Sequence, residues 1–109
     1  MVVARMSTWK FKSGQRDSAL EIISKKGDDP EKMKGSRGYL FMMPSDDPDA
    51  GVFITLWEDE VSLQASFEGV FKEVARDVEK YTASPPEMKK LQVHSAEIAE
   101  IAPEIVKPA

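Results

Sequence analysis

The stretch ITLWEDEVSLQASFEGVFKEV, residues 54–74, decides how the rest of this chain is arranged. It opens with β-branched and apolar residues, which favour a strand, and continues with apolar residues at helical spacing. The acidic residues Glu58, Asp59 and Glu60 separate the two patterns, and aspartate is a common helix N-cap. Because a strand passes directly into an amphipathic helix at Trp57, this segment would form a wall of any pocket between sheet and helix.

The helical part of this segment continues beyond residue 74. Its apolar residues recur at spacings of three and four and form one stripe: Leu63, Phe67, Val70, Val74, Val78 and Tyr81. Ser84, Pro85 and Pro86 end the pattern, because proline lacks a backbone donor and clashes with the preceding turn. The sequence therefore predicts one long helix that begins after Asp59.

Further strands and a second helix are predicted around this segment. Strands are expected over residues 2–11, 38–44, 51–57 and 89–98, and the other helix over residues 15–26. The short acidic loop after residue 44 favours an antiparallel hairpin between its flanking strands. The order predicts an α+β fold of the ferredoxin-like split βαβ-βαβ type, a four-stranded antiparallel sheet with two main helices on one face.

Length and composition are typical of one globular domain, with 109 residues, 41% hydrophobic and 31% charged. We expect a single domain over residues 1–109, with a folded core of about 2–98 and a C-terminal tail over 99–109. The chain contains no cysteine, which excludes disulfides, thiolate nucleophiles and cysteine zinc sites. It contains no signal-peptide pattern and no stretch of about 20 apolar residues, so we expect a cytoplasmic protein without a membrane partner.

The net charge of −4 is unevenly distributed. Residues 1–38 carry nine basic and five acidic side chains, whereas residues 39–109 carry six basic and fourteen acidic ones. The basic residues Lys32, Lys34 and Arg37 lie in a predicted loop, and no base-stacking aromatic residues are interleaved with them. We therefore interpret them as solvated loop charges and expect no nucleic-acid partner.

Two of the predicted strands, GYLFMMP and GVFITLW, are apolar at nearly every position. A strand covered on one face should alternate between apolar and polar residues. In the second strand one face carries Val52, Ile54 and Leu56, and the other carries Phe53, Thr55 and Trp57. Because two helices cover one face of the sheet, a second copy of the same sheet is the simplest cover for the other. We predict a homodimer through this second sheet face, with residues 98–106 either embracing the partner or packing on their own subunit.

Polar candidates for a pocket come from the first strand. Arg5, Ser7 and Trp9 share a face by alternation, so two polar side chains would enter mostly apolar surroundings. A cation near a phenol favours the phenolate and lowers its pKa, which makes Arg5 the sharper candidate. The same arginine could equally pair with a helix carboxylate.

Two other groups suggest chemistry but have simpler interpretations. His94 would titrate near neutral pH, yet a lone histidine on a poorly alternating strand is more typical of a surface or strand-end position. Asp46, Asp47 and Asp49 offer oxygen ligands but lack the pattern of a calcium-binding loop. We interpret them as a solvated hairpin loop and expect no metal site.

The hairpin and helix start GSRGYLFMMPSDDPDAGVFITLWEDEVSL, the helix that follows and the exit PPEMKKLQV resemble the antibiotic biosynthesis monooxygenase domain over about residues 2–98. The most specific part is Trp57 at a strand end followed by Glu58, Asp59 and Glu60, with Ser13-Gly14 before the first helix. The resemblance implies a dimeric α/β barrel built from two ferredoxin-like halves.

Members of this family include cofactor-free oxygenases of quinols and anthrones, heme-degrading proteins and proteins without an assigned activity. The resemblance implies a small cofactor-independent monooxygenase acting on an aromatic or quinol-like molecule, without cofactor, in a pocket between sheet and helices. The residues expected around the substrate are Trp57, Phe53, Phe67, Ser7, Arg5 and Ser66. The catalytic residue is not identified, because such chemistry requires no fixed triad.

The heme-degrading branch is disfavoured by the resemblance itself. Its heme-contacting asparagine falls at Ser7, its helix tryptophan at Ser66 and its axial histidine at Ala75. Alanine cannot ligate iron. Oxygenase members often carry a histidine near the position of Ser66, so histidine-assisted acid–base chemistry is also in doubt.

Two other functions remain open at this stage. The protein could be a non-catalytic dimer that binds or senses a small apolar ligand, which the missing histidine favours. It could also be a structural or stress-related dimer whose pocket is filled by side chains. The volume of the cavity between sheet and helices separates the last alternative from the others.

Overall fold

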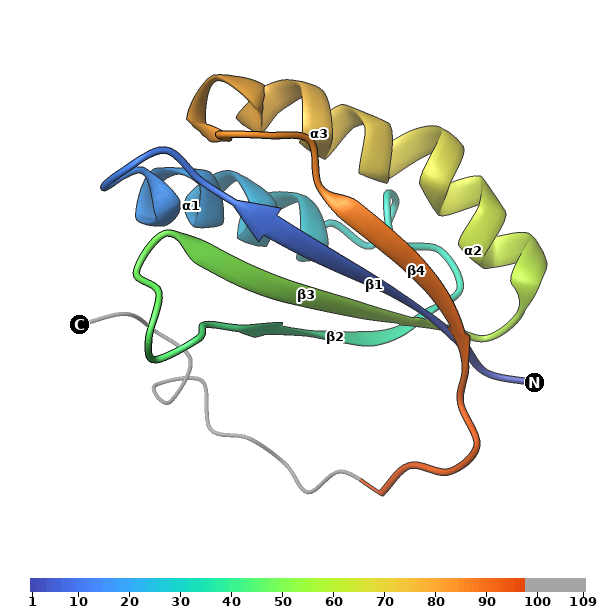
Figure 1. Cartoon of the computed structure of the whole chain (residues 1–109). Coiled ribbons are helices and arrows are strands. Elements are labelled where there is room, and N and C mark those ends of the chain that lie inside the picture. The colour runs from blue at the N-terminus through green and yellow to red at the C-terminus, as the bar shows by residue number, and fades with distance from the viewer. Residues whose placement is uncertain (98–109) are drawn as a thin grey trace.

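The computed structural model describes residues 1–97 and contains a four-stranded antiparallel sheet with all helices on one face (Figure 1). The strands are β1 (Val3–Lys10), β2 (Ser36–Met42), β3 (Ala50–Trp57) and β4 (Glu87–Gln92). Helix α1 (Arg16–Gly27) follows β1, and a longer helical segment follows β3. That segment consists of α2 (Glu60–Ser66), a π-helical turn (Phe67–Phe71), α3 (Lys72–Val78) and a 3₁₀ turn (Glu79–Tyr81).

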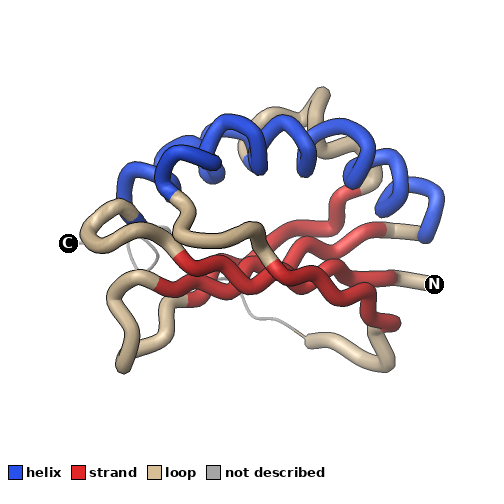
Figure 2. The backbone as a smooth tube through the Cα atoms, turned by 45° about the horizontal axis from the view of Figure 1, so that its top comes forward, coloured by secondary structure: helices blue, strands red, loops and turns tan. Residues whose placement is uncertain are grey.

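The strand order is β2-β3-β1-β4, and every neighbouring pair is antiparallel. Each βαβ unit is therefore split by an intervening strand, which confirms the predicted ferredoxin-like α+β fold. The sheet of one chain is open and does not close into a barrel. Its two layers, helices above and sheet below, are seen most directly in Figure 2.

The long helix begins as predicted. The Asp59 carboxylate accepts a hydrogen bond from the backbone N–H of Ser62 at 2.8 Å, which satisfies one of the free donors of the first turn. This bond lowers the pKa of Asp59. Between residues 1 and 97, no helix has the length and apolar character that crossing a bilayer would require.

Strands β2 and β4 differ most from the predicted bounds: β2 ends at Met42 rather than at residue 44, and β4 begins at Glu87 rather than at residue 89. Strand β2 begins at Ser36 rather than Gly38, because an irregularity between these residues lets pairing with β3 continue across a predicted loop. Strand β4 ends at Gln92, although the sequence predicts a strand up to residue 98. The last register pair between β4 and β1 is Gln92 with Val3, and one further backbone hydrogen bond, from the N–H of Val93 to the carbonyl oxygen of Val2 at 3.1 Å, ends the pairing. Residues 98–109, including the predicted tail, lie outside the described residues.

The two faces of the sheet differ as the alternation in β3 predicts. Phe53, Thr55 and Trp57 are buried under the helices. Phe53 belongs to the main hydrophobic core, to which both the sheet and the helices contribute residues. Ile54 and Leu56 point to the second face and are half-buried. No helix within residues 1–97 covers this second face (Figure 2).

Candidate functional site

A small internal cavity lies between the sheet and the helices. Its walls are mostly aromatic and aliphatic, and its lining residues are Arg5, Trp9, Ile23, Lys26, Gly27, Met33, Phe53, Thr55, Trp57, Val70, Phe71 and Val74. The cavity volume is about 20 Å³, enough for about one water molecule. Side chains therefore fill most of the space, and a larger ligand would have to displace some of them.

Arg5 places a positive charge in these apolar surroundings. Its side chain comes from β1, and only 6% of the residue is exposed. The guanidinium carbon lies 4.6 Å from the ring centroid of Phe71 and 6.0 Å from that of Trp57. Such cation–π contacts compensate part of the cost of burying the charge.

The guanidinium of Arg5 has no counter-ion in the described part of the chain. Its Nη1 atom is buried without a hydrogen-bond partner, and no carboxylate of residues 1–97 forms an ion pair with it. The alternative of pairing with a helix carboxylate is therefore not realised there. Burial lowers the pKa of Arg5 from its ordinary value to about 10, so the side chain remains a cation at neutral pH.

Two tryptophans form the floor of the cavity, and both use the same local arrangement. The indole N–H of Trp57 donates to the hydroxyl of Thr55 at 2.8 Å, and that of Trp9 donates to the hydroxyl of Ser7 at 2.9 Å. In each pair the acceptor lies two residues earlier on the same face of the strand. Because both indole donors are satisfied internally, the rings present apolar surfaces to the cavity.

Ser7 thus contributes to the cavity indirectly, as the hydrogen-bond acceptor of Trp9. It is buried, its hydroxyl also lies 3.4 Å from the carbonyl oxygen of Phe53, and it does not line the cavity. The expected contact between Ser7 and a substrate stays a prediction. The pattern of a hydroxyl residue two positions before a tryptophan, present in both strands, could have indicated this role from the sequence.

The middle of the long helix departs from the predicted stripe. The turn from Phe67 to Phe71 is π-helical, with hydrogen bonds spanning five residues instead of four. The additional residue shifts the helix phase, so Phe71 is buried over the cavity and Phe67 stacks on it, at 5.8 Å between ring centroids. Phe67 therefore does not line the internal cavity, and Phe71 occupies the place expected for it.

Ser66 also lies elsewhere than the resemblance implies. It is buried, and its hydroxyl donates to the carbonyl oxygen of Leu63 at 2.6 Å. It lines neither the internal cavity nor the groove beside it. A contact with substrate at Ser66 stays a prediction that the present side-chain position does not favour.

An open groove adjoins the cavity between α2 and β4. Its volume is about 210 Å³, and it is lined by Arg5, Leu63, Gln64, Phe67, Met88, Lys89 and Lys90. Arg5 is the residue shared by the groove and the internal cavity. A ligand bound at Arg5 could therefore extend from the core toward solvent.

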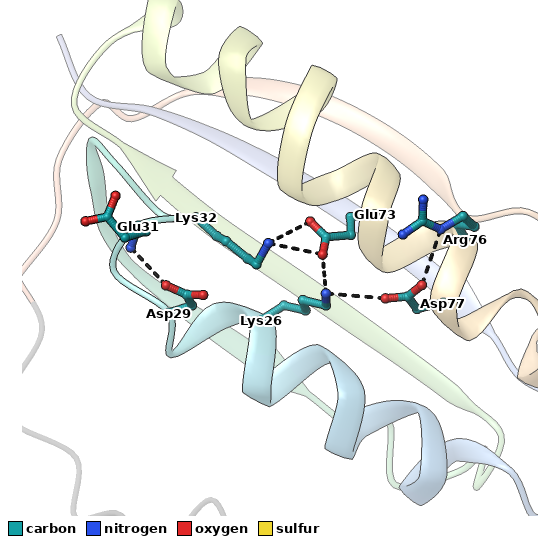
Figure 3. A network of polar contacts seen from close by, with 7 residues as sticks. All are labelled: Lys26, Asp29, Glu31, Lys32, Glu73, Arg76 and Asp77. Carbon is teal, nitrogen blue, oxygen red and sulfur yellow. Dashed lines mark hydrogen bonds and ion pairs between the residues drawn. The ribbon is translucent and has the colours of Figure 1, made fainter.

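A charged network joins the end of α1 and the turn between α1 and β2 to α3 (Figure 3). Glu73 of α3 forms ion pairs with Lys26 at the end of α1 and with Lys32 of the turn, the latter at 3.0 Å. Lys26 also lies 3.4 Å from Asp77. Met33, next to Lys32, is half-buried and packs against both parts of the core.

The network shifts the pKa values of Glu73 and Lys26. Hydrogen bonds from Lys26, then from Lys32, lower the pKa of Glu73 to about 2. The bond to Glu73 is the main cause that raises the pKa of Lys26. At neutral pH Glu73 and Lys26 are therefore charged, and the ion pairs of Glu73 fasten the turn that carries Met33 to α3.

The remaining polar candidates lie away from the cavity. His94 is exposed beyond the end of β4, where its Nδ1 lies 3.3 Å from the hydroxyl of Ser95. In the hairpin loop, Asp47 pairs with Lys10, and Asp49 accepts a hydrogen bond from the backbone N–H of Gly14 at 3.1 Å. Residues 1–97 contain no group of three or more histidine, aspartate or glutamate side chains placed to hold a metal ion.

Comparison with known proteins identifies the fold. No protein-family model matches this sequence, and no curated protein sequence is significantly similar to it. A candidate antibiotic biosynthesis monooxygenase from Chloroflexus aurantiacus superposes with a TM-score of 0.72 at 21% identity, covering 91% of this chain and 100% of that chain. Another from Nitrosomonas europaea gives a TM-score of 0.76 at 13% identity, covering 85% of this chain and 90% of that one.

SnoaB from Streptomyces nogalater, a cofactor-independent oxygenase, is also similar. Its TM-score is 0.73 at 11% identity, and the match covers 87% of this chain and 95% of that chain. The chain therefore has the fold of the antibiotic biosynthesis monooxygenases. At these identities the similarity concerns the fold, so chemistry has to be argued from the residues described above.

Proposed function

We propose that this protein binds the anion of a small aromatic or quinol-like molecule between sheet and helices and promotes its cofactor-independent oxygenation. The observation that carries the proposal is Arg5, a buried cation that has no counter-ion among residues 1–97 and faces an apolar, aromatic cavity. A protein interior tolerates such a charge poorly unless an anion compensates it. A phenolate or enolate would supply that anion.

The chemistry follows from the same surroundings. In an anthrone-like substrate, loss of a proton from the activated CH₂ group gives an anion that Arg5 would stabilise. Reaction of this anion with O₂ forms a carbon–oxygen bond, and loss of water then leaves a carbonyl group. The overall change is CH₂ plus O₂ to C=O plus H₂O, and the substrate supplies all four electrons that reduce O₂.

The cavity also restricts the substrate. Its lining within the described residues contains no histidine and no carboxylate that could act as a base. The substrate must therefore be acidic enough to ionise beside Arg5, as electron-rich phenols, hydroquinones and anthrones are. A nearby positive charge lowers the pKa of such an acidic group on the substrate by about one to three pH units.

The test combines binding with oxygen consumption. Wild-type protein, Arg5→Met and the exposed-arginine control Arg37→Met are mixed with an anthrone and a naphthohydroquinone in an oxygen electrode. We expect wild type and Arg37→Met to exceed the buffer rate, and Arg5→Met to lose roughly 100-fold of the catalysed rate. Oxygen uptake at the buffer rate by wild type would contradict the oxygenase activity.

The small cavity supports a second candidate function, binding or sensing without turnover. A volume of about 20 Å³ requires rearrangement before any aromatic ligand fits. Anaerobic titration with 2-naphthol separates the two functions, because the naphtholate absorption band reports ionisation. If 2-naphthol ionises on binding but the oxygen electrode shows no uptake with the anthrone or the naphthohydroquinone, the result supports a sensor. If 2-naphthol does not bind, the result supports a structural protein with a filled pocket.

A further inference from the structure

The groove between α2 and β4 combines an apolar wall with positive charge. Leu63, Phe67 and Met88 form the apolar part, and Lys90 and Arg5 contribute cationic side chains. Gln64, which also lines the groove, is held by Glu68 through a hydrogen bond of 3.2 Å. At about 210 Å³ the groove is much larger than the internal cavity.

Arg5 and Lys90 lie directly opposite each other in the antiparallel pair β1–β4. Both therefore project to the helix side of the sheet, and like charges at such positions repel each other. Glu60, in the first turn of α2, compensates Lys90 at 3.0 Å, whereas Arg5 has no counter-ion among residues 1–97. Lys89, which also lines the groove, is in register with Met6, so its side chain projects to the other face of the sheet. The two cations on the helix side therefore share one carboxylate, that of Glu60.

We propose that this groove binds a carboxylate carried by the ligand, which makes the ligand an aromatic hydroxy acid. Its ring hydroxyl ionises beside Arg5, and its carboxylate lies along the groove at Lys90, where it competes with Glu60. The apolar wall formed by Leu63, Phe67 and Met88 covers the part of the ring between the two polar ends. The inference rests on the proposed function, because it places the ring hydroxyl at Arg5.

The experiment compares two probes that differ in one charge, 6-hydroxy-2-naphthoate and its methyl ester. Isothermal titration calorimetry of the full chain is expected to give roughly fivefold tighter binding for the acid, because Lys90 is half-exposed and its ion pair is screened by water. Lys90→Gln should abolish this preference, and Glu60→Gln should increase it. Lys12→Gln, which removes an exposed lysine elsewhere, should leave it unchanged.

The location is checked by amide chemical shifts in ¹H–¹⁵N spectra. Both probes should shift the amide of Met88, which contacts the ring, whereas the amide of Lys90 should shift more with the acid than with the ester. Far-UV circular dichroism establishes that each variant keeps the wild-type fold.

The outcomes separate this inference from the function on which it rests. If acid and ester bind equally, or if Lys90→Gln keeps the preference, the groove is not a carboxylate site. If in that case the ester still binds, and Arg5→Met weakens its binding, the proposed function stands although the carboxylate site does not. If neither probe nor 2-naphthol binds, both proposals are wrong.

Discussion

Arg5 is the residue at which function and stability oppose each other. Its guanidinium is buried, has one nitrogen without a hydrogen-bond partner among residues 1–97, and lies against two aromatic rings. Cation–π contacts contribute about 0.5–2 kcal/mol, whereas the desolvation of an unpaired charge costs several kcal/mol. A residue that costs the fold this much is expected to be retained for what it binds.

Replacing Arg5 by methionine should therefore make the free protein more stable. Methionine has a similar length and no charge to desolvate, so we expect the free energy of unfolding to rise by about 1–2 kcal/mol. Urea denaturation measures this change, and Arg37→Met should stay within about 0.5 kcal/mol of wild type. A large loss of stability in Arg5→Met would mean that the cation is part of the structural core.

The pair of Trp57 and Thr55 allows a second prediction at the same scale. Thr55→Val leaves a buried indole N–H without an acceptor, which should cost about 1–3 kcal/mol. Trp57→Phe removes that donor, so adding Thr55→Val to Trp57→Phe should cost much less. Equilibrium denaturation of the four proteins gives the coupling energy, and strictly additive costs would contradict the importance of this hydrogen bond.

Single residues were predicted correctly from the sequence where the two-residue alternation of a strand applies. Alternation along β1 places Arg5, Ser7 and Trp9 on one face, and the structure confirms that all three are buried. It could not identify which side chains use their polar atoms internally, so Ser7 was expected in the pocket although its hydroxyl serves Trp9. Periodicity constrains direction, whereas hydrogen-bond partners depend on tertiary packing.

At the scale of elements, the long helix shows the same limit. Of the predicted stripe from Leu63 to Tyr81, the buried members are Leu63, Val70, Val74 and Val78, whereas Phe67 and Tyr81 are half-buried. A period of 3.6 residues cannot represent the π-helical turn, which gives Phe71 the place expected for Phe67. Helix irregularities of this kind have no sequence pattern comparable to an N-cap, so the central part of the site could not be predicted.

The ion-pair network between α1, the following turn and α3 should make stability depend on acid pH. The pKa of Glu73 falls from 4.5 to about 2 on folding, so its contribution is complete above about pH 4.5 and is lost as the pH falls toward 2. In Glu73→Gln this part of the pH dependence should disappear. Urea denaturation across this pH range measures it, with the exposed Glu21→Gln as control. An unchanged acid slope in Glu73→Gln would contradict the role of the network.

The turn held by this network should control access to the cavity through Met33. Methionine is flexible and fills irregular gaps, and here it is half-buried against the cavity. Met33→Ala should enlarge the cavity and tighten 2-naphthol binding, at a cost in stability of about 1–2 kcal/mol, below that of a fully buried site. Calorimetric titration measures the binding, and Met43→Ala on the surface is the matched control. Unchanged or weaker binding in Met33→Ala would show that this side chain does not limit access.

At the scale of the whole molecule, topology was the most predictable property. Two βαβ units joined by a short acidic hairpin have few compact arrangements, and the observed order β2-β3-β1-β4 is the expected one. The strand ends were less predictable because they depend on the partner strand, as at Gln92, the last residue of β4 in register with β1. The topology of one chain does not determine how two chains assemble, which depends on the second face of the sheet.

We propose that this face joins two copies into a homodimer. Met6, Ile54 and Leu40 are cross-strand partners in one row of that face, and no helix of residues 1–97 covers them. An apolar sheet face of this kind is stabilised by packing on a second sheet, and a two-fold related copy offers a complementary one. Light scattering should therefore give twice the chain mass of 12.2 kDa at micromolar concentration.

A charge in the centre of this row tests the dimer directly. Ile54→Lys should give a folded monomer, because the side chain is half-buried in one chain but would be desolvated between two. Val61→Lys, at a position with 78% exposure on α2, should remain dimeric and controls for the added charge. Circular dichroism establishes that Ile54→Lys is folded. A wild-type mass of one chain, or an Ile54→Lys protein that stays dimeric, would show that this face is not the interface.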